Sequence, residues 1–282
     1  MDVLSANRGL RYIDQPFGLY SASSNHLAHL PIVDQGQFIH LDREEEPRVE
    51  RFLSALFSGD LVVNAPWEFW KSRFQRTTDR VLLKIVDAKG LIDWIDERFD
   101  VQTVYLTRHP IPTSLSIIRN GWDLTAHSYL RCKAFSNKWL GDGRREEVWG
   151  ILESGTELEK YVLNWGLENL KPLALCGSRP DWLHLHYEDV LRSPDETLEA
   201  LASRLDLGDL ESMRQVIRQP SRSTAKLSSN YTSAAPLAQI TKWQSVVSTQ
   251  DVRSAQAVLD LLGIQCYTAD SAFPATSSST GS

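Results

Sequence analysis

Residues 101–122, VQTVYLTRHPIPTSLSIIRNGW, contain the clearest signal for the fold. The first part, Val101–Thr107, is an apolar run rich in residues that favour strands, and His109-Pro110 interrupts it. After Pro112 the apolar residues recur at helical spacing as far as Asn120. The stretch therefore predicts a strand, a tight turn and a helix, with Arg108 at the carboxyl end of the strand.

The same alternation continues on both sides of this stretch. We predict a buried strand over Val81–Val86, an amphipathic helix over Leu91–Phe99 and a short strand over Trp182–Tyr187. A Ser-Pro-Asp-Glu sequence at 193–196 marks the start of another helix, and a last helix is predicted over 250–262. Strands and helices that alternate at this spacing indicate an α/β fold, with right-handed crossovers and helices flanking a parallel sheet.

Two segments lack such periodicity. Residues 122–150 are predicted to form an irregular excursion over the sheet, of the kind that builds a substrate site. The chain from Ser271 onward is rich in Ser, Thr and Ala, which is typical of disorder. We therefore expect a single domain over residues 1–268 and a disordered tail over 269–282.

The composition argues against several classes of protein. A formal net charge of −6 over 282 residues argues against a general nucleic-acid binder, which needs an excess of Lys and Arg. No apolar run reaches the roughly 20 residues of a transmembrane helix, and the N-terminus has no signal-peptide pattern. The three cysteines show neither metal nor disulfide spacing, so we expect a cytoplasmic protein.

Arg108 and Ser116 form the first candidate site. Arginine offers a planar fork of donors, serine adds a hydroxyl, and the start of the following helix adds unpaired N–H groups, so together they suit a phosphate or sulfate. Ligands of open α/β sheets also gather at the carboxyl ends of strands. A surface arginine in a salt bridge, with a serine facing solvent, explains the same residues equally well.

These residues also carry a family resemblance. Arg108-His109-Pro110, with Ser116 eight residues after the arginine, resembles the segment with which sulfotransferases bind the 3'-phosphate of 3'-phosphoadenosine-5'-phosphosulfate (PAPS). Tyr187-Glu188-Asp189-Val190 and Lys242-Trp243 are similar to two later motifs of that family, in the same order. The resemblance spans about residues 7–263. It implies a P-loop nucleotide-kinase-like sulfotransferase fold, with PAPS as cosubstrate and no metal.

The resemblance implies roles for several residues. Arg108 and Ser116 would bind the 3'-phosphate, and Tyr187 would lie near the adenine. Arg222, between two hydroxyl residues in Ser221-Arg222-Ser223, falls where many members bind the cofactor. A half-buried strand tyrosine and an exposed polar loop are the competing interpretations of Tyr187 and Arg222.

Lys84 and Asp87 are the candidate catalytic residues. A lysine within an apolar strand is costly unless it is paired or reaches a site, and members of the family often have a lysine here that steadies the sulfonate. Val86 occupies the place of the family's catalytic histidine, so Asp87 is a candidate substitute base, although a helix cap is the slightly favoured interpretation of this residue. His40, His109 and His127 are other titratable candidates.

His184 and His186 alternate on one strand face, as metal-binding pairs do, but the spacing provides no third ligand, and packing beside Tyr187 is the favoured interpretation. No Gly-rich loop matches the family's 5'-phosphosulfate loop, so we expect an N-terminally truncated fold with impaired transfer.

The sequence leaves three candidate functions for this protein. The first is a sulfotransferase-like enzyme that acts on a small-molecule or carbohydrate acceptor through a hydroxyl or amine. The second is a non-catalytic relative that binds a nucleotide or a protein. A kinase-like enzyme is the third, and it would need a Walker-type loop that the sequence lacks.

Overall fold

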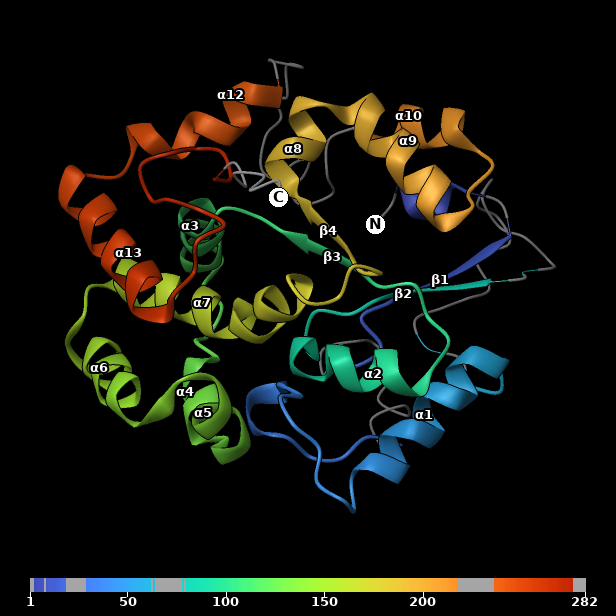
Figure 1. The fold of residues 1–282 in the computed structure, drawn as a ribbon, viewed down its shortest axis with the longest axis horizontal. Coiled ribbons are helices and arrows are strands. Elements are labelled where there is room, and N and C mark those ends of the chain that lie inside the picture. The colour runs from blue at the N-terminus through green and yellow to red at the C-terminus, as the bar shows by residue number, and fades with distance from the viewer. Residues whose placement is uncertain are drawn as a thin grey trace, which may run out of the picture. The chain divides into compact units, whose positions relative to one another are not determined.

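The structure, a computed structural model of the chain, describes residues 3–7, 9–18, 29–61, 63, 78, 80–217 and 236–275. It is an α/β structure with parallel strand pairs and many helices, which confirms the predicted fold class at that level (Figure 1). The chain divides into two compact units. The first comprises residues 1–91 and 193–232, and the second comprises residues 92–192 and 233–282.

Two parallel strands form the sheet of the first unit. β1 (Leu10–Asp14) pairs with β2 (Arg80–Lys84), so that Leu10 lies opposite Arg80 and Asp14 lies opposite Lys84. β2 overlaps the strand predicted at 81–86 over residues 81–84. Because parallel pairing aligns equivalent ends, the carboxyl ends of both strands meet at Asp14 and Lys84.

Helix α1 (Glu46–Ser58) supplies the main apolar face of the first unit. Its buried residues recur at helical spacing: Val49, Phe52, Leu53 and Leu56. The ring of Phe17, which is buried, meets Phe52 edge-on with 5.7 Å between ring centroids. Arg11 on β1 donates from its guanidinium to the carbonyls of Leu56 and Phe57 at the end of the helix. A cation in this position complements the negative end of the helix dipole and satisfies carbonyls that the helix leaves unpaired.

The remaining elements of this unit are short. They are η1 (Leu4–Ala6), η3 (Asp34–Gly36), η4 (Lys89–Leu91), α9 (Pro194–Leu205) and α10 (Leu210–Ile217). Pro194 occupies the first turn of α9 as predicted, but Ser193 makes no side-chain capping bond. Arg80 instead secures the other end of α9, because its Nη1 donates to the Leu205 carbonyl at 2.6 Å.

A second parallel pair forms the sheet of the second unit. β3 (Val104–Thr107) pairs with β4 (Leu183–His186), and Thr107 lies opposite His186 at the carboxyl ends. β3 leads into α3 (Pro110–Asn120) as the sequence predicted. The helix begins where His109 Nδ1 accepts the amide of Ile111, and it ends at Gly121 in a left-handed conformation.

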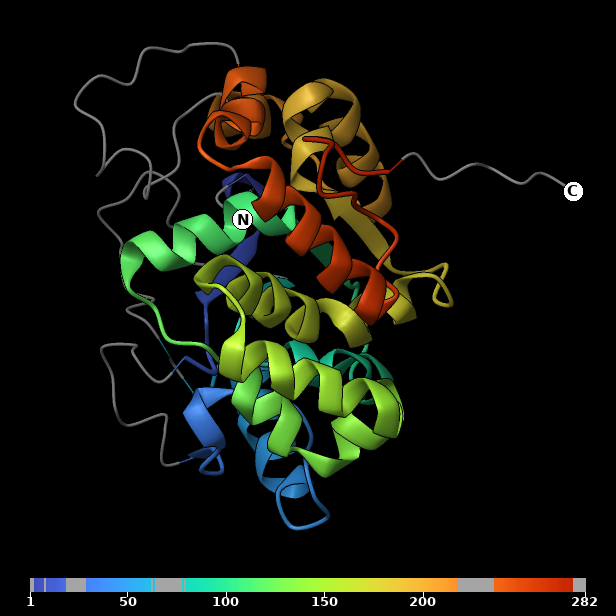
Figure 2. The same cartoon turned by 90° about the vertical axis from the view of Figure 1, so that its left-hand side faces the viewer.

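Helix α7 (Glu157–Cys176) is the scaffold of this unit, because both α3 and α13 (Thr249–Leu262) pack against it (Figure 2). A capping box between Thr156 and Glu159 fixes its start. At Gly166 of α7, a Cβ would lie 2.3 Å from the Leu262 side chain of α13, so the glycine permits close packing of these two helices.

The prediction of an irregular excursion over residues 122–150 is wrong. The structure forms α4 (Ala126–Arg131), α5 (Lys133–Trp139) and α6 (Gly141–Ser154) there, and α4 and α6 pack on α7. Tyr129 and Phe135 meet edge-on with their ring centroids 5.0 Å apart, and both are buried. Aromatic packing between short segments thus holds these helices. Short helices of this kind do not produce a long periodic pattern of apolar residues in the sequence.

The rest of the second unit is α2 (Ile92–Arg98), α8 (Tyr187–Arg192), α12 (Pro236–Thr241), η5 (Lys242–Ser245) and the segment after α13. That last segment folds back on itself, because Tyr267 and Pro274 form an antiparallel bridge and the Ala275 amide donates to the Cys266 carbonyl at 2.9 Å. Across the described ranges, no helix combines the length and the apolar composition needed to cross a bilayer.

Candidate functional site

The carboxyl ends of β3 and β4 bring two of the predicted residues together. Arg108 follows β3 and Tyr187 follows β4, directly after the last paired residues, Thr107 and His186. The Arg108 Cζ lies 4.9 Å from the centroid of the Tyr187 ring, which is a cation–π contact. In the part of the chain that the structure describes, no carboxylate forms an ion pair with Arg108. Its donors therefore remain available for an anion.

Ser116 lies on the helix that follows Arg108, but well beyond its first turn. The Ser116 carbonyl accepts the side-chain amide of Asn120 at 2.7 Å, and the residue is half-buried. Nearer to the start of α3, the Thr113 hydroxyl is occupied, because it donates to the His109 carbonyl at 2.8 Å. No described contact joins the Ser116 side chain to Arg108 or Tyr187, whereas Thr113 completes the helix start.

A buried carboxylate beside this pair is a feature that the sequence did not reveal. Glu188 is 1% exposed. Its Oε1 accepts the backbone amide of His109 at 2.9 Å, and its Oε2 accepts the hydroxyl of Tyr267 at 2.8 Å. Burial and the neighbouring Glu188 charge both raise the pKa of Tyr267, so the phenol stays protonated and donates. Glu188 stands inside a recognised motif, but only the fold shows that its side chain turns inward.

The two strand histidines belong to the same polar cluster. His184 Nε2 and His186 Nδ1 lie 2.9 Å and 3.1 Å from the Thr107 hydroxyl oxygen, and His186 Nδ1 lies 3.0 Å from the Tyr267 oxygen. Burial and, to a smaller extent, the neighbouring His186 lower the pKa of His184 to about 4. Burial also lowers the pKa of His186, against the opposing charges of Asp189 and Glu188. Both imidazoles are therefore neutral at pH 7.

No described residues form a group of three or more His, Cys, Asp or Glu that could hold a metal ion. The alternation of His184 and His186 instead serves hydrogen bonding across the sheet. Because the Thr107 hydroxyl donates to the Leu185 carbonyl at 3.3 Å, its oxygen is left to accept from His184 Nε2.

His109, a titratable candidate, is fully buried, and its ring connects the start of α3 to the segment after α13. Its Nδ1 caps α3 at Ile111, and its Nε2 lies 3.1 Å from the Thr268 carbonyl. The ring stacks on Trp243 with 4.7 Å between centroids. Burial lowers the pKa of His109 to about 4, opposed by hydrogen bonds to the carbonyls of Thr268 and Ser271. Neither nitrogen of this neutral ring is free to serve as a base.

The other histidine candidates, His40 and His127, have no described contact with this cluster. His40 is exposed in the first unit. The ring of His127 lies 5.7 Å from that of Trp149, between α4 and α6. Neither of them has a described contact with a predicted site residue.

Lys84 lies in the first unit and is paired. Its Nζ is 3.0 Å from Asp14 Oδ1, directly across the β1–β2 pair, and the two side chains are 31% and 43% exposed. The sequence predicted that a lysine here needs a partner or a site, and Asp14 is the partner. Partial exposure leaves the ammonium accessible from solvent at the carboxyl end of the sheet.

Asp87 lies in the turn between β2 and η4. Its carbonyl accepts the Phe38 amide at 2.8 Å, which fixes the turn. Its Oδ2 lies 3.3 Å from the point where residue 18 would place a Cβ, so Gly18 permits the close approach of this carboxylate. Asp87 and Lys84 thus belong to one end of one sheet. Arg222, the remaining predicted cofactor residue, lies outside the described residues.

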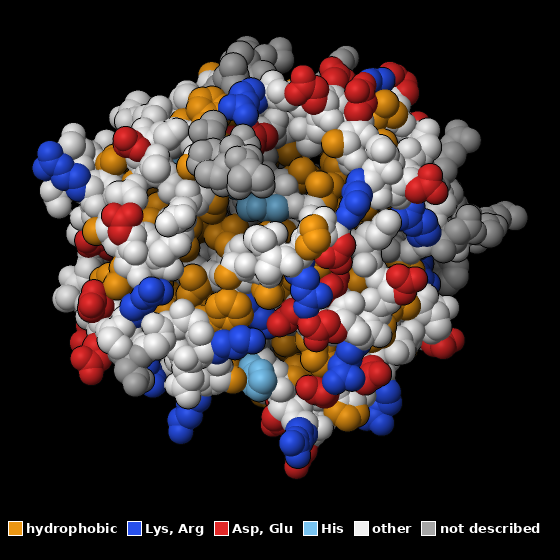
Figure 3. Space-filling model, viewed as in Figure 1, with side chains coloured by type: hydrophobic (Ala, Val, Ile, Leu, Met, Phe, Trp, Pro, Cys, Tyr) orange, Lys and Arg blue, Asp and Glu red, His pale blue; other side chains and the backbone are white. Residues whose placement is uncertain are grey.

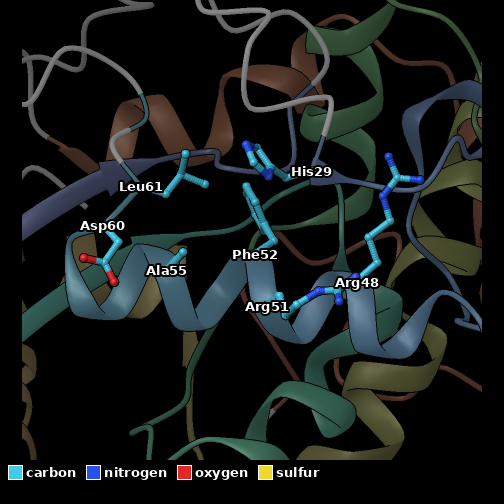
Figure 4. Close-up of a pocket in the computed structure, with 7 residues that line it drawn as sticks. All are labelled: His29, Arg48, Arg51, Phe52, Ala55, Asp60 and Leu61. Atoms are coloured by element: carbon cyan, nitrogen blue, oxygen red, sulfur yellow. The ribbon is translucent and has the colours of Figure 1, made fainter.

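The first unit also contains a cavity of about 510 Å³. It is lined by His29, Arg48, Arg51, Phe52, Ala55, Asp60 and Leu61. In Figure 4, Phe52 rises from α1 toward His29, Arg48 rises from the same helix, and Arg51 lies along it. None of the residues predicted from the sequence lines it, so the cavity and the candidate site are different places.

Charged side chains of both signs are interspersed on the face that Figure 3 shows, with hydrophobic atoms visible between them. Comparison of the chain with protein-family models, with curated proteins and with solved structures finds no match.

Proposed function

We propose that this protein has a P-loop-type sulfotransferase fold and binds PAPS as a sulfonate donor for a hydroxyl or amine acceptor. The observation that carries the proposal is the pairing of Arg108 with Tyr187 at the carboxyl ends of two parallel strands, 4.9 Å apart and without a described carboxylate on the arginine. Ligands of α/β proteins gather at this edge. A cation next to an aromatic ring suits a phosphate attached to a nucleoside.

The described residues fit the nucleoside 3'-phosphate. Arg108 can keep its contact with the Tyr187 ring and still donate from the edge of its planar guanidinium to phosphate oxygens. The hydroxyls of Ser116 and Tyr187 would supply further hydrogen bonds, the latter to the adenine. Arg222 would add a second cation to the cofactor. Three free cysteines fit the reducing cytoplasm in which we place the protein.

Lys84 and Asp87 would carry the transfer. The acceptor O–H or N–H gives its proton to the Asp87 carboxylate as its oxygen or nitrogen bonds to sulfur. The bond between sulfur and the 5'-phosphate oxygen breaks, and adenosine 3',5'-bisphosphate leaves. Lys84 would offset the negative charge that spreads over the sulfonate.

One observation favours the second candidate, a nucleotide-binding protein that does not transfer. Lys84 lies 3.0 Å from Asp14, so part of its charge is already neutralised. A lysine held in this way stabilises the β1–β2 pair more directly than it stabilises a transition state. The two candidates share the Arg108 site and differ in what Lys84 does.

Calorimetry with adenosine 3',5'-bisphosphate tests the binding that both candidates share. Arg108→Ala should weaken binding about 10- to 100-fold, because hydrogen bonds from a charged group contribute about 1.5–3 kcal/mol. Arg119→Ala, an exposed arginine in the last turn of α3, is the matched control. Wild-type protein that does not bind the nucleotide, or equal affinities in the two variants, would refute the proposal.

Transfer of labelled sulfonate from PAPS to alcohol and amine acceptors then separates the candidates. Turnover that is lost in Lys84→Ala supports the enzyme. Tight binding without turnover in the wild-type protein supports the non-catalytic relative.

A further inference from the structure

Glu188 is a buried carboxylate whose partners are all neutral. Within the described part of the chain no cation pairs with it, and its two oxygens accept one backbone amide and one phenol. A carboxylate is costly to bury, and exchange of a buried charged group for an apolar one is often neutral or even stabilising. Stability alone therefore explains this residue poorly, whereas its two hydrogen bonds connect specific segments of the fold.

The bond between Glu188 and His109 joins the two strand ends that present the candidate site. His109 is the residue after Arg108, and Glu188 is the residue after Tyr187. A single 2.9 Å hydrogen bond thus ties the backbone amide one position beyond Arg108 to the side chain one position beyond Tyr187. Besides the sheet and the Arg108–Tyr187 contact, this hydrogen bond links the turn after β3 to the start of α8.

The second oxygen of Glu188 fixes the carboxylate itself. Tyr267 donates to it at 2.8 Å and is almost fully buried. Because an ionised carboxylate only accepts, the Tyr267 proton must point at Glu188, which leaves the phenol oxygen to accept from His186 Nδ1 at 3.0 Å. The directions of the Tyr267 and His186 hydrogen bonds thus follow from the charge on Glu188.

From these contacts we propose that Glu188 is a positioning residue, which holds Arg108 over Tyr187 in the geometry that recognises a nucleoside 3'-phosphate. The inference rests on the proposed function for the identity of the ligand. Glu188 does not touch the ligand. It acts through the backbone of the turn after β3, and Tyr267 orients its carboxylate.

Two nucleotide probes isolate this role. Calorimetry measures the affinities for adenosine 3',5'-bisphosphate and for adenosine 5'-monophosphate, which lacks the 3'-phosphate. The Glu188→Ala variant should bind the bisphosphate about 10-fold more weakly, because roughly one charged hydrogen bond is misplaced. Its affinity for the monophosphate should not change. Glu188→Gln keeps an acceptor for the His109 amide and should restore affinity to within about threefold.

Asp189→Asn is the matched control, because Asp189 is the adjacent carboxylate of the same helix and pairs at 2.6 Å with Arg192 in an exposed i,i+3 contact. It should leave both affinities unchanged. A double-mutant cycle adds a second test. In the Arg108→Ala background, adding Glu188→Ala should lower the affinity for the bisphosphate by less than about threefold, because Glu188 acts through Arg108.

A readout without any ligand separates this inference from the proposed function. The δ-methylene protons of Arg108 should show an upfield ring-current shift from Tyr187 in protein with labelled arginine. The shift should persist in Asp189→Asn and disappear in Glu188→Ala. If Glu188→Ala does not fold, Tyr267→Phe removes one donor while it keeps the ring, and it should reduce both the shift and the bisphosphate affinity.

Loss of the 3'-phosphate preference and of the shift in Glu188→Ala, with both kept in Asp189→Asn, supports the positioning role. If Glu188→Ala and Asp189→Asn show the same 3'-phosphate preference and the same ring-current shift, the positioning role is refuted. If Glu188→Ala does not fold, it is refuted when Tyr267→Phe leaves the shift and the bisphosphate affinity unchanged. If wild-type protein binds neither nucleotide, the proposed function fails, and the ring-current comparison alone decides whether Glu188 positions the pair.

Discussion

Lowering the pH should destabilise the protein through His109, and the size of the effect follows from its surroundings. The ring is fully buried against Trp243 and Tyr267, and Arg108 is the nearby cation. Burial lowers its pKa to about 4, from 6.5 in an unfolded chain. The unfolded chain therefore takes up a proton first as the pH falls. Stability from the neutral ring is complete above pH 6.5 and is lost progressively toward pH 4.

The expected loss can be worked out for a window that avoids most carboxyl groups. Between pH 7.5 and pH 5.0, a histidine with these two pKa values lowers the free energy of unfolding by about 2 kcal/mol. His109→Asn removes the titrating ring but keeps a side-chain oxygen that can cap α3. The variant also loses the stacking on Trp243, which shifts its stability by an amount that does not depend on pH.

Urea unfolding of both proteins at several pH values measures this difference. The stability advantage of the wild-type protein over His109→Asn should shrink by about 2 kcal/mol from pH 7.5 to pH 5.0. Contributions from other groups, His184 among them, appear in both proteins and cancel in the comparison. Parallel stability curves would refute the reasoning, as would a ring resonance of His109 that titrates near pH 6.5 in the folded protein.

Three further predictions concern stability and are measured by urea unfolding. Gly90→Ala should cost about 1–3 kcal/mol or more, because its Cβ would lie 2.5 Å from the Cα and carbonyl oxygen of Ile39, and backbone cannot move aside as a side chain can. Gly150→Ala in α6, where a Cβ meets no atom within 4 Å, should instead stabilise by about 0.5–1 kcal/mol, and a loss would contradict the open space. Thr156→Ala removes the capping box of α7 and should cost about 1 kcal/mol, while an unchanged midpoint would show that the cap is dispensable.

The strand–turn–helix unit around Arg108 was predictable because its signals are local. A strand-forming run, a His-Pro break and a helical period stand next to one another, and β3 and α3 appear where they indicate. The helices over residues 126–154 were missed because α6 begins with Gly-Asp-Gly, which is typical of a loop. Their packing on α7 overrides that local preference.

The polar cluster around Glu188 could not be predicted in the same way. Glu188 lies 79 residues from both His109 and Tyr267 along the chain, and Tyr267 stands in no motif. Pairing of Lys84 with Asp14 was equally hidden, since it depends on the register of two strands that are far apart in sequence. Sequence reasoning could state that a buried charge needs a partner, but only the fold names the partner.

The bond from His109 to Thr268 has a consequence for how the protein is made. These residues are 159 positions apart, so a chain leaving the ribosome makes the turn after β3 long before the carbonyl that holds it. Tyr267, which orients Glu188, emerges equally late. The site around Arg108 would therefore mature only near the end of synthesis, and a chain arrested at residue 260 should lack the Arg108–Tyr187 contact that the released protein has. Residues 267 and 268 would thus set the moment at which the Arg108–Tyr187 contact forms.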